Sequence, residues 1–139
     1  MISRKVLPRP HEMGRVLVNL KVSNNADPSK SITCAALVDT GASHLVLPQA
    51  WKSQLGNLET VQILDAETAT QATVRGEICG PVRLQVEGFR PVFTEVMFID
   101  MEPIDGEYEP MLGYTPLQQI PVTVDMAHDR LVSVKADLR

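Results

Sequence analysis

The segment from Ala35 to Ser43 constrains this chain most, because an apolar run leads directly into a carboxylate and a glycine. Residues 35–38 (AALV) have the length and composition of a strand that is buried on both faces. Asp39 follows at once, and burying its charge would be costly unless the charge is paired or hydrogen-bonded. Gly41 allows a sharp turn that brings backbone N–H groups close to this carboxylate. We therefore interpret the segment as a candidate catalytic loop.

The surrounding sequence distinguishes this loop from an ordinary turn, in which an aspartate side chain bonds its own backbone. Ala42 and Ser43 follow the Asp-Thr-Gly string, and a second apolar segment covers residues 45–47 (LVL). Later in the chain, residues 110–113 (PMLG) place two apolar residues before a glycine, and residues 114–119 are helix-like. Both features together favour a catalytic loop over a simple turn.

These two features resemble the active-site segments of retropepsin-like aspartic proteases, and the resemblance runs from about residue 15 to about residue 135. In that family a hydrophobic-hydrophobic-glycine segment lies beside the catalytic loop, and a short helix follows it. The resemblance implies an all-β, single-domain retropepsin-like acid protease barrel with a flap hairpin and one or two short helices. The domain would span residues 15–139 and follow an N-terminal arm of residues 1–14.

The hydrophobic pattern by itself also predicts many short strands separated by turns, which is typical of a β-barrel. Pro48 can open a helical turn that Gly56 ends, and Trp51 inside this turn is expected to pack against the core. Residues 100–109 are acidic and contain proline and glycine, so they are expected to form an exposed loop. Strands are expected within residues 16–22, 32–38, 45–47, 60–84 (two strands around a polar tip), 82–86, 92–99, 122–124 and 131–134.

The resemblance implies a role for each residue of the active-site loop. Asp39 would be the catalytic carboxylate, and Thr40 would hydrogen-bond across the axis of a dimer. Gly41 would let the substrate backbone approach closely, and Ala42 would line the cleft. Ser43 continues this loop, although viral members of the family tend to carry acids after the alanine.

The resemblance also implies a flap and a second loop. Four residues at the tip of the hairpin after the catalytic loop would cover the substrate: Ala66, Glu67, Thr68 and Ala69. This tip contains no glycine, unlike some viral flaps. In the second loop, Leu112 would help to shape the wall of the cleft, and Gly113 would lie beside the catalytic loop.

The chemistry of such a site requires two carboxylates that share a proton, one to activate water and one to protonate the carbonyl oxygen. This chain has a single Asp-Thr-Gly, so the second Asp39 would come from a second copy in a symmetric homodimer. The sequence thus predicts an aspartic endopeptidase that acts on polypeptides without a cofactor or metal. A non-catalytic peptide-binding or dimerisation module with this fold is the alternative, and a small β-barrel binding protein with a chance tripeptide is a third.

Composition excludes several other classes of function. The chain has 139 residues, which suits one domain, and its net charge of -4 provides no basic stripe for nucleic acid. Cys34 and Cys79 form no Cys-x-x-Cys pair, which predicts buried thiols in a reducing, cytoplasmic environment. The three histidines are scattered without zinc spacing, and no apolar run approaches the length of a membrane span.

Overall fold

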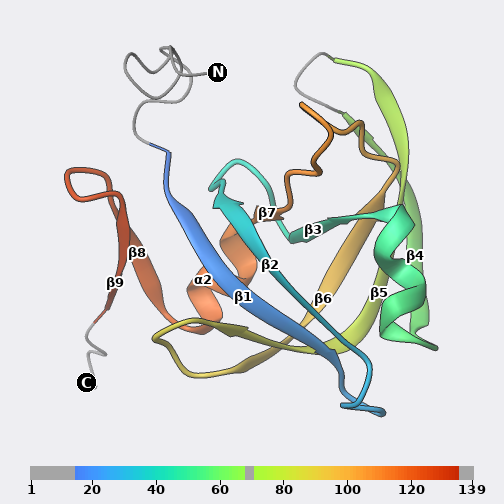
Figure 1. Ribbon diagram of the computed structural model, residues 1–139, viewed down its shortest axis with the longest axis horizontal. Coiled ribbons are helices and arrows are strands. Elements are labelled where there is room, and N and C mark those ends of the chain that lie inside the picture. The colour runs from blue at the N-terminus through green and yellow to red at the C-terminus, as the bar shows by residue number, and fades with distance from the viewer. Residues whose placement is uncertain (1–14, 68–70, 135–139) are drawn as a thin grey trace.

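The computed structural model of the chain describes residues 15–67 and 71–134 (Figure 1). Short strands dominate, and each strand is bounded by the turn residues that the sequence places between apolar segments. In chain order the elements are β1 (Leu17–Asn24), β2 (Ser31–Val38), β3 (Leu45–Pro48), the 3-10 helix η2 (Gln49–Leu55), β4 (Glu59–Glu67), β5 (Thr73–Val86), β6 (Val92–Ile99), β7 (Met111–Leu112), α2 (Tyr114–Gln119), β8 (Val122–Asp125) and β9 (Arg130–Ser133).

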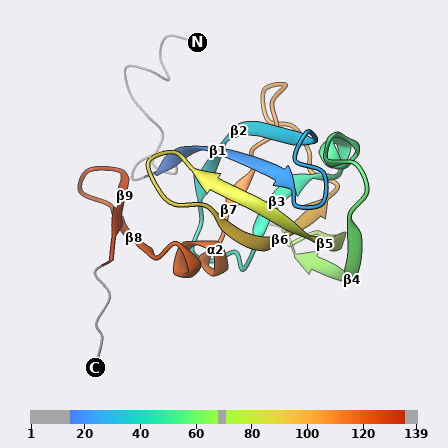
Figure 2. The same ribbon diagram turned by 90° about the horizontal axis from the view of Figure 1, so that it is seen from below.

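Six strands close into a barrel. The strands of the large sheet follow the order β1-β2-β7-β3-β6-β5-β4, and an additional pairing of β1 with β5 closes the ring. Among the described residues strand β4 pairs only with β5, so the β4–β5 hairpin projects from the barrel as a flap would (Figures 1 and 2). Strands β8 and β9 form a separate two-stranded sheet beside α2. The predicted all-β barrel with a flap hairpin and two short helices is confirmed.

The core of the barrel is aliphatic. Strand β3 runs parallel to β6, and Leu45, Leu47 and Phe98 on these strands are all 0% exposed. Each such side chain stabilises the fold by about 1.5–3 kcal/mol. Trp51 packs against this core from η2, and its ring centroid lies 5.9 Å from that of Tyr108. The packing role expected for the tryptophan is therefore confirmed.

Strand β5 is longer than the sequence predicts. Residues 73–86 form one strand of 14 residues, where the hydrophobic pattern suggested a break near residue 82. The register shifts between Cys79 and Val82, around Gly80 and Pro81. Because of this irregularity, the first half of β5 pairs with β4 and the second half pairs with β1. One bent strand thus joins the flap to the closing edge of the barrel.

The prediction that residues 35–38 are buried on both faces is wrong for the isolated chain. Ala36 is 1% exposed, but Ala35 is exposed and Leu37 and Val38 are only half-buried. The physical reason is that β2 forms one wall of a closed barrel, so alternate side chains point outward. This outward face lies directly before the candidate catalytic residue.

Four further expectations concern the end of η2, the two cysteines, membrane-spanning helices and the N-terminal arm. Gly56 ends η2 with φ of 68°, a left-handed conformation that suits glycine. Cys34 is half-buried and Cys79 is buried, and both are free thiols. Within residues 15–67 and 71–134 no helix is long and apolar enough to cross a membrane. The predicted N-terminal arm, residues 1–14, lies outside the described residues.

Candidate active site

The loop that carries Asp39 leaves β2 between two neighbouring strands that hold its backbone. The N–H of Val38 donates to the carbonyl of Val16 at 2.8 Å, on the β1 side. The N–H of Asp39 donates to the carbonyl of Leu112 at 3.0 Å, on the β7 side. The aspartate therefore starts from a strand end that is fixed on both sides.

Asp39 is a half-buried residue, and its carboxylate is held by its own loop. Its Oδ1 accepts a hydrogen bond from the backbone N–H of Gly41 at 2.9 Å. A Cβ atom at Gly41 would lie 3.2 Å from this oxygen, which is tighter than most real contacts. Left-handed φ values occur at Gly56, Gly88 and Gly106 but not at Gly41. Close approach to the carboxylate, and not a left-handed turn, is the reason for glycine here.

The second loop locks onto the active-site loop through the backbone. A Cβ atom at Gly113 would lie 2.4 Å from the carbonyl oxygen of His44 and 2.5 Å from that of Ala42, so only glycine fits. Three N–H groups at the start of α2 donate to three carbonyls of the active-site loop: Gly113 to His44 at 2.9 Å, Tyr114 to Ala42 at 2.8 Å and Thr115 to Ser43 at 3.1 Å. The two loops thus form one rigid backbone unit.

The predicted residues of these two loops differ in how exposed their side chains are. Thr40 is exposed next to the carboxylate, and Ala42 and Ser43 are half-buried. Ser43 Oγ lies 2.7 Å from Nδ1 of His44. Leu112 was expected to shape the wall of the cleft, but its side chain is 0% exposed in the core. Its contribution to the site is the carbonyl that holds Asp39.

The flap residues are only partly described. Glu67 ends β4 and is exposed, and Ala66 pairs with Val74 across the hairpin. The predicted tip residues Thr68 and Ala69 lie outside the described residues, so their covering role stays a prediction.

The flap strand β4 exposes apolar side chains. Val61 and Ile63 on β4 alternate as a half-buried strand should, yet they are 52% and 50% exposed. The reason is that β4 lies outside the closed ring, so the barrel core does not cover this face.

One ion pair near the site was not predicted. Arg15 Nη2 lies 2.8 Å from Glu109 Oε1, and both side chains are partly exposed. Arg15 immediately precedes the residue that holds Val38, and Glu109 immediately precedes Pro110, whose carbonyl accepts from the N–H of Leu37 at 2.8 Å. The two residues are far apart in the sequence, and no local pattern links them. The pair connects the two segments that hold the end of β2.

The described residues support neither a cysteine nucleophile nor a metal centre. Burial raises the pKa of Cys34 to about 11 and also raises the pKa of Cys79, so both thiols are protonated at neutral pH and poor nucleophiles. In the described part of the chain no three His, Cys, Asp or Glu side chains gather as metal ligands would. The carboxylate of Asp39 is the group around which the loops are built.

A comparison with solved structures agrees with this geometry. EIAV protease in complex with the inhibitor HBY-793 is similar to this chain with a TM-score of 0.55 and 21% identity, over 81% of this chain and 92% of that chain. The fold is retropepsin-like. No protein-family model matches the chain, and no curated protein matches it. At 21% identity the likeness establishes the retropepsin-like fold and does not establish the chemistry of the site.

Proposed function

We propose that this chain is an aspartic endopeptidase that works as a homodimer. The observation that carries the proposal is the Asp39 carboxylate, held by the N–H of Gly41 at 2.9 Å at the end of a barrel strand. The retropepsin-like fold supports this role, because a solved structure with a similar fold is that of a protease in complex with an inhibitor.

The second carboxylate comes from a second copy of the chain. No other aspartate in the sequence is followed by Thr-Gly or Ser-Gly. Thr40 is exposed beside Asp39, which suits a contact between two identical loops across a two-fold axis. In the C-terminal hairpin, Val132 and Val134 are 37% and 46% exposed, and an exposed apolar strand in a two-stranded sheet suits association with a partner.

The pair of carboxylates would hydrolyse a peptide bond by shared proton transfer. The ionised carboxylate takes a proton from water, and the water oxygen attacks the carbonyl carbon. The protonated carboxyl donates its proton to the carbonyl oxygen, which gives a neutral tetrahedral intermediate. When the C–N bond breaks, the protonated carboxyl donates its proton to the nitrogen, and the ionised carboxylate takes a proton from a hydroxyl of the intermediate, so that the pair again holds one proton. These steps need no metal and no cofactor.

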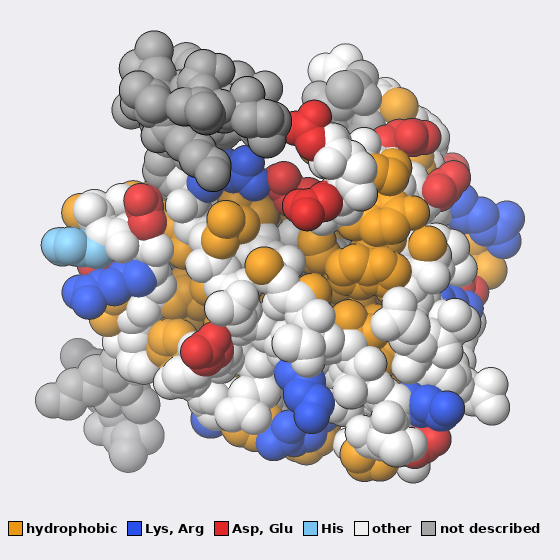
Figure 3. Space-filling view, in the orientation of Figure 1, with side chains coloured by type: hydrophobic (Ala, Val, Ile, Leu, Met, Phe, Trp, Pro, Cys, Tyr) orange, Lys and Arg blue, Asp and Glu red, His pale blue; other side chains and the backbone are white. Residues whose placement is uncertain are grey.

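The surface suits an extended polypeptide substrate. Val61 and Ile63 expose apolar side chains on the flap strand, where they can contact a bound chain. On the face seen in Figure 3, apolar side chains gather near the centre, and acidic side chains lie along the upper edge of this patch. The free thiols of Cys34 and Cys79 suit a reducing environment, so we also propose a cytoplasmic location.

The test compares cleavage of an unfolded protein by the wild type, by Asp39→Asn and by the matched control Asp100→Asn, which alters an exposed aspartate after β6. We expect the wild type and the control to cut, and Asp39→Asn to stay folded without cutting. Activity should rise faster than linearly with enzyme concentration when the dimer dissociates. Full activity in Asp39→Asn would exclude the proposal. Folded dimers of the wild type that bind peptide without cutting would favour the non-catalytic module.

A further inference from the structure

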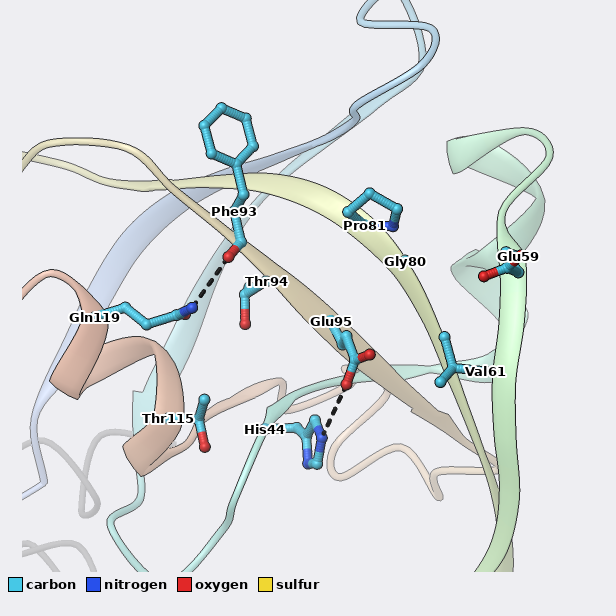
Figure 4. A pocket seen from close by; sticks show the side chains of 10 residues that line it. All are labelled: His44, Glu59, Val61, Gly80, Pro81, Phe93, Thr94, Glu95, Thr115 and Gln119. Atoms are coloured by element: carbon cyan, nitrogen blue, oxygen red, sulfur yellow. Dashed lines mark hydrogen bonds and ion pairs between the residues drawn. The ribbon is translucent and has the colours of Figure 1, made fainter.

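A pocket with a volume of about 370 Å³ lies beside the active-site loop (Figure 4). It lies between His44 of that loop, strands β4 to β6 and helix α2, with Thr115 of α2 at one side. Asp39 is not among the described residues that line it. The pocket is therefore a separate hollow next to the candidate catalytic group.

The wall of this pocket is continuous with the active-site loop. The carbonyl of His44 accepts from Gly113 at 2.9 Å, and the carbonyl of Ser43 accepts from Thr115 at 3.1 Å. His44 lies five positions after Asp39 in the same loop. A group bound in the pocket would thus contact the backbone unit that holds the catalytic carboxylate. A chain that passes Asp39 in an extended conformation would reach the pocket a few residues away.

The charged side chains that line the pocket are mainly acidic. Glu59 of β4 and Glu95 of β6 both line the hollow, with Glu59 at its edge and Glu95 beside His44 (Figure 4). Among the described residues that line it, none is lysine or arginine. The one group able to carry positive charge is His44, whose Nε2 lies 3.8 Å from Oε1 of Glu95. At this separation the histidine leaves room at the Glu95 carboxylate for another donor.

Apolar side chains also line the pocket. Val61, 52% exposed, lies on the same side as the two glutamates, whereas the ring of Phe93, 56% exposed, points away from them (Figure 4). Lysine and arginine lay their methylene stems along apolar surface and keep the charged head near water or an acid. Two acids with apolar neighbours match such a side chain better than they match an acidic or a purely apolar one.

We propose that this pocket is a specificity site that binds the lysine or arginine side chain of a polypeptide substrate, at a position some residues away from the bond held at Asp39. Glu59 and Glu95 bind the cationic head, and Val61 supports its stem. The claim that the bound polypeptide is also cut depends on the proposed function. It goes further by naming the class of substrate.

The cleavage test uses a peptide library prepared from a digested proteome. Mass spectrometry of the products shows how often lysine or arginine occurs at each position around the cut. With the wild type we expect one position away from the cut to be enriched in basic residues by roughly fivefold, as for two partly exposed ion pairs. The double variant Glu59→Gln/Glu95→Gln should lose this enrichment, and Glu59→Lys/Glu95→Lys should select acidic residues there. Glu102→Gln, an exposed glutamate outside the pocket, is the matched control.

A binding test separates this inference from the proposed function. The same library is passed over immobilised Asp39→Asn, with and without Glu59→Gln/Glu95→Gln, and the retained peptides are sequenced. Retention of basic peptides that depends on the glutamates supports the pocket, even if the wild type cuts nothing and the proposed function fails. Cleavage with no preference for basic residues, or a preference that survives in the double variant, overturns the pocket and leaves the protease intact. Urea unfolding of every variant confirms that it is folded.

Discussion

Gly113 lies so close to the backbone of His44 that a Cβ atom would come within 2.4 Å of the histidine carbonyl oxygen. The same glycine donates its N–H to that oxygen at 2.9 Å. The contact joins two loops that lie about seventy positions apart, and it needs a residue without a side chain. Gly113 therefore affects the site by fixing the position of the active-site loop.

Replacing this glycine should disrupt the site. In Gly113→Ala the backbone of the active-site loop must move, and we expect a loss of about 3 kcal/mol or more in the free energy of unfolding. Gly76→Ala is the matched control, because a Cβ there would meet Met97 Sδ at an ordinary 3.4 Å. The control should remain within about 1 kcal/mol of the wild type. Urea unfolding measures both, and equal stability of the two variants would contradict the prediction.

The ion pair between Arg15 and Glu109 should stabilise the fold modestly. Both side chains are partly exposed, so a coupling free energy of about 0.5–1 kcal/mol is expected. A double-mutant cycle of Arg15→Met and Glu109→Gln, measured by urea unfolding, isolates this coupling. It should decrease as salt is added, because the pair is open to screening. A coupling of zero at low salt would show that the two segments are held by their backbone hydrogen bonds alone.

The stability of the protein should depend on pH through Glu77. The hydrogen bond from Lys52 holds the pKa of Glu77 below its usual value, and a hydrogen bond from the Thr60 hydroxyl lowers this pKa further. A carboxyl whose pKa is lowered by folding stabilises the folded state above its unfolded pKa, about 4.3 for glutamate. This contribution is lost as the pH falls through the lower folded value.

The measurement is the difference in unfolding free energy between the wild type and Glu77→Gln, from about pH 7 to about pH 3. We expect the wild type to be the more stable of the two near neutrality. The difference should shrink as the solution becomes acidic. A difference that stays constant down to the lowest pH would exclude an ion pair between Glu77 and Lys52 as its source.

Several elements could be predicted because their causes are local. The period of two in residues 16–22 indicated β1, and the turn residues after it indicated the hairpin to β2. Proline and glycine at positions 48 and 56 indicated both ends of η2. Residues 114–119 were expected to be helical, and α2 covers the same range. In each case the deciding interactions reach only a few residues along the chain.

Other features were mispredicted because they depend on which strands meet. The outward face of β2 follows from the closure of the barrel through β1 and β5. The single strand β5 follows from an irregular register that serves two partners. A hydrophobic pattern shows that a face is apolar, but it does not show what covers it.

The sequence by itself indicated the fold class and the candidate catalytic group, since an apolar run, Asp-Thr-Gly and a later apolar-glycine segment suffice to suggest both. Only the tertiary structure decided that the Leu112 carbonyl holds Asp39, that Arg15 meets Glu109, and that two glutamates from different strands share a pocket. These contacts join residues far apart in the chain. Their geometry is set by strand register and barrel closure, which no local run of residues encodes.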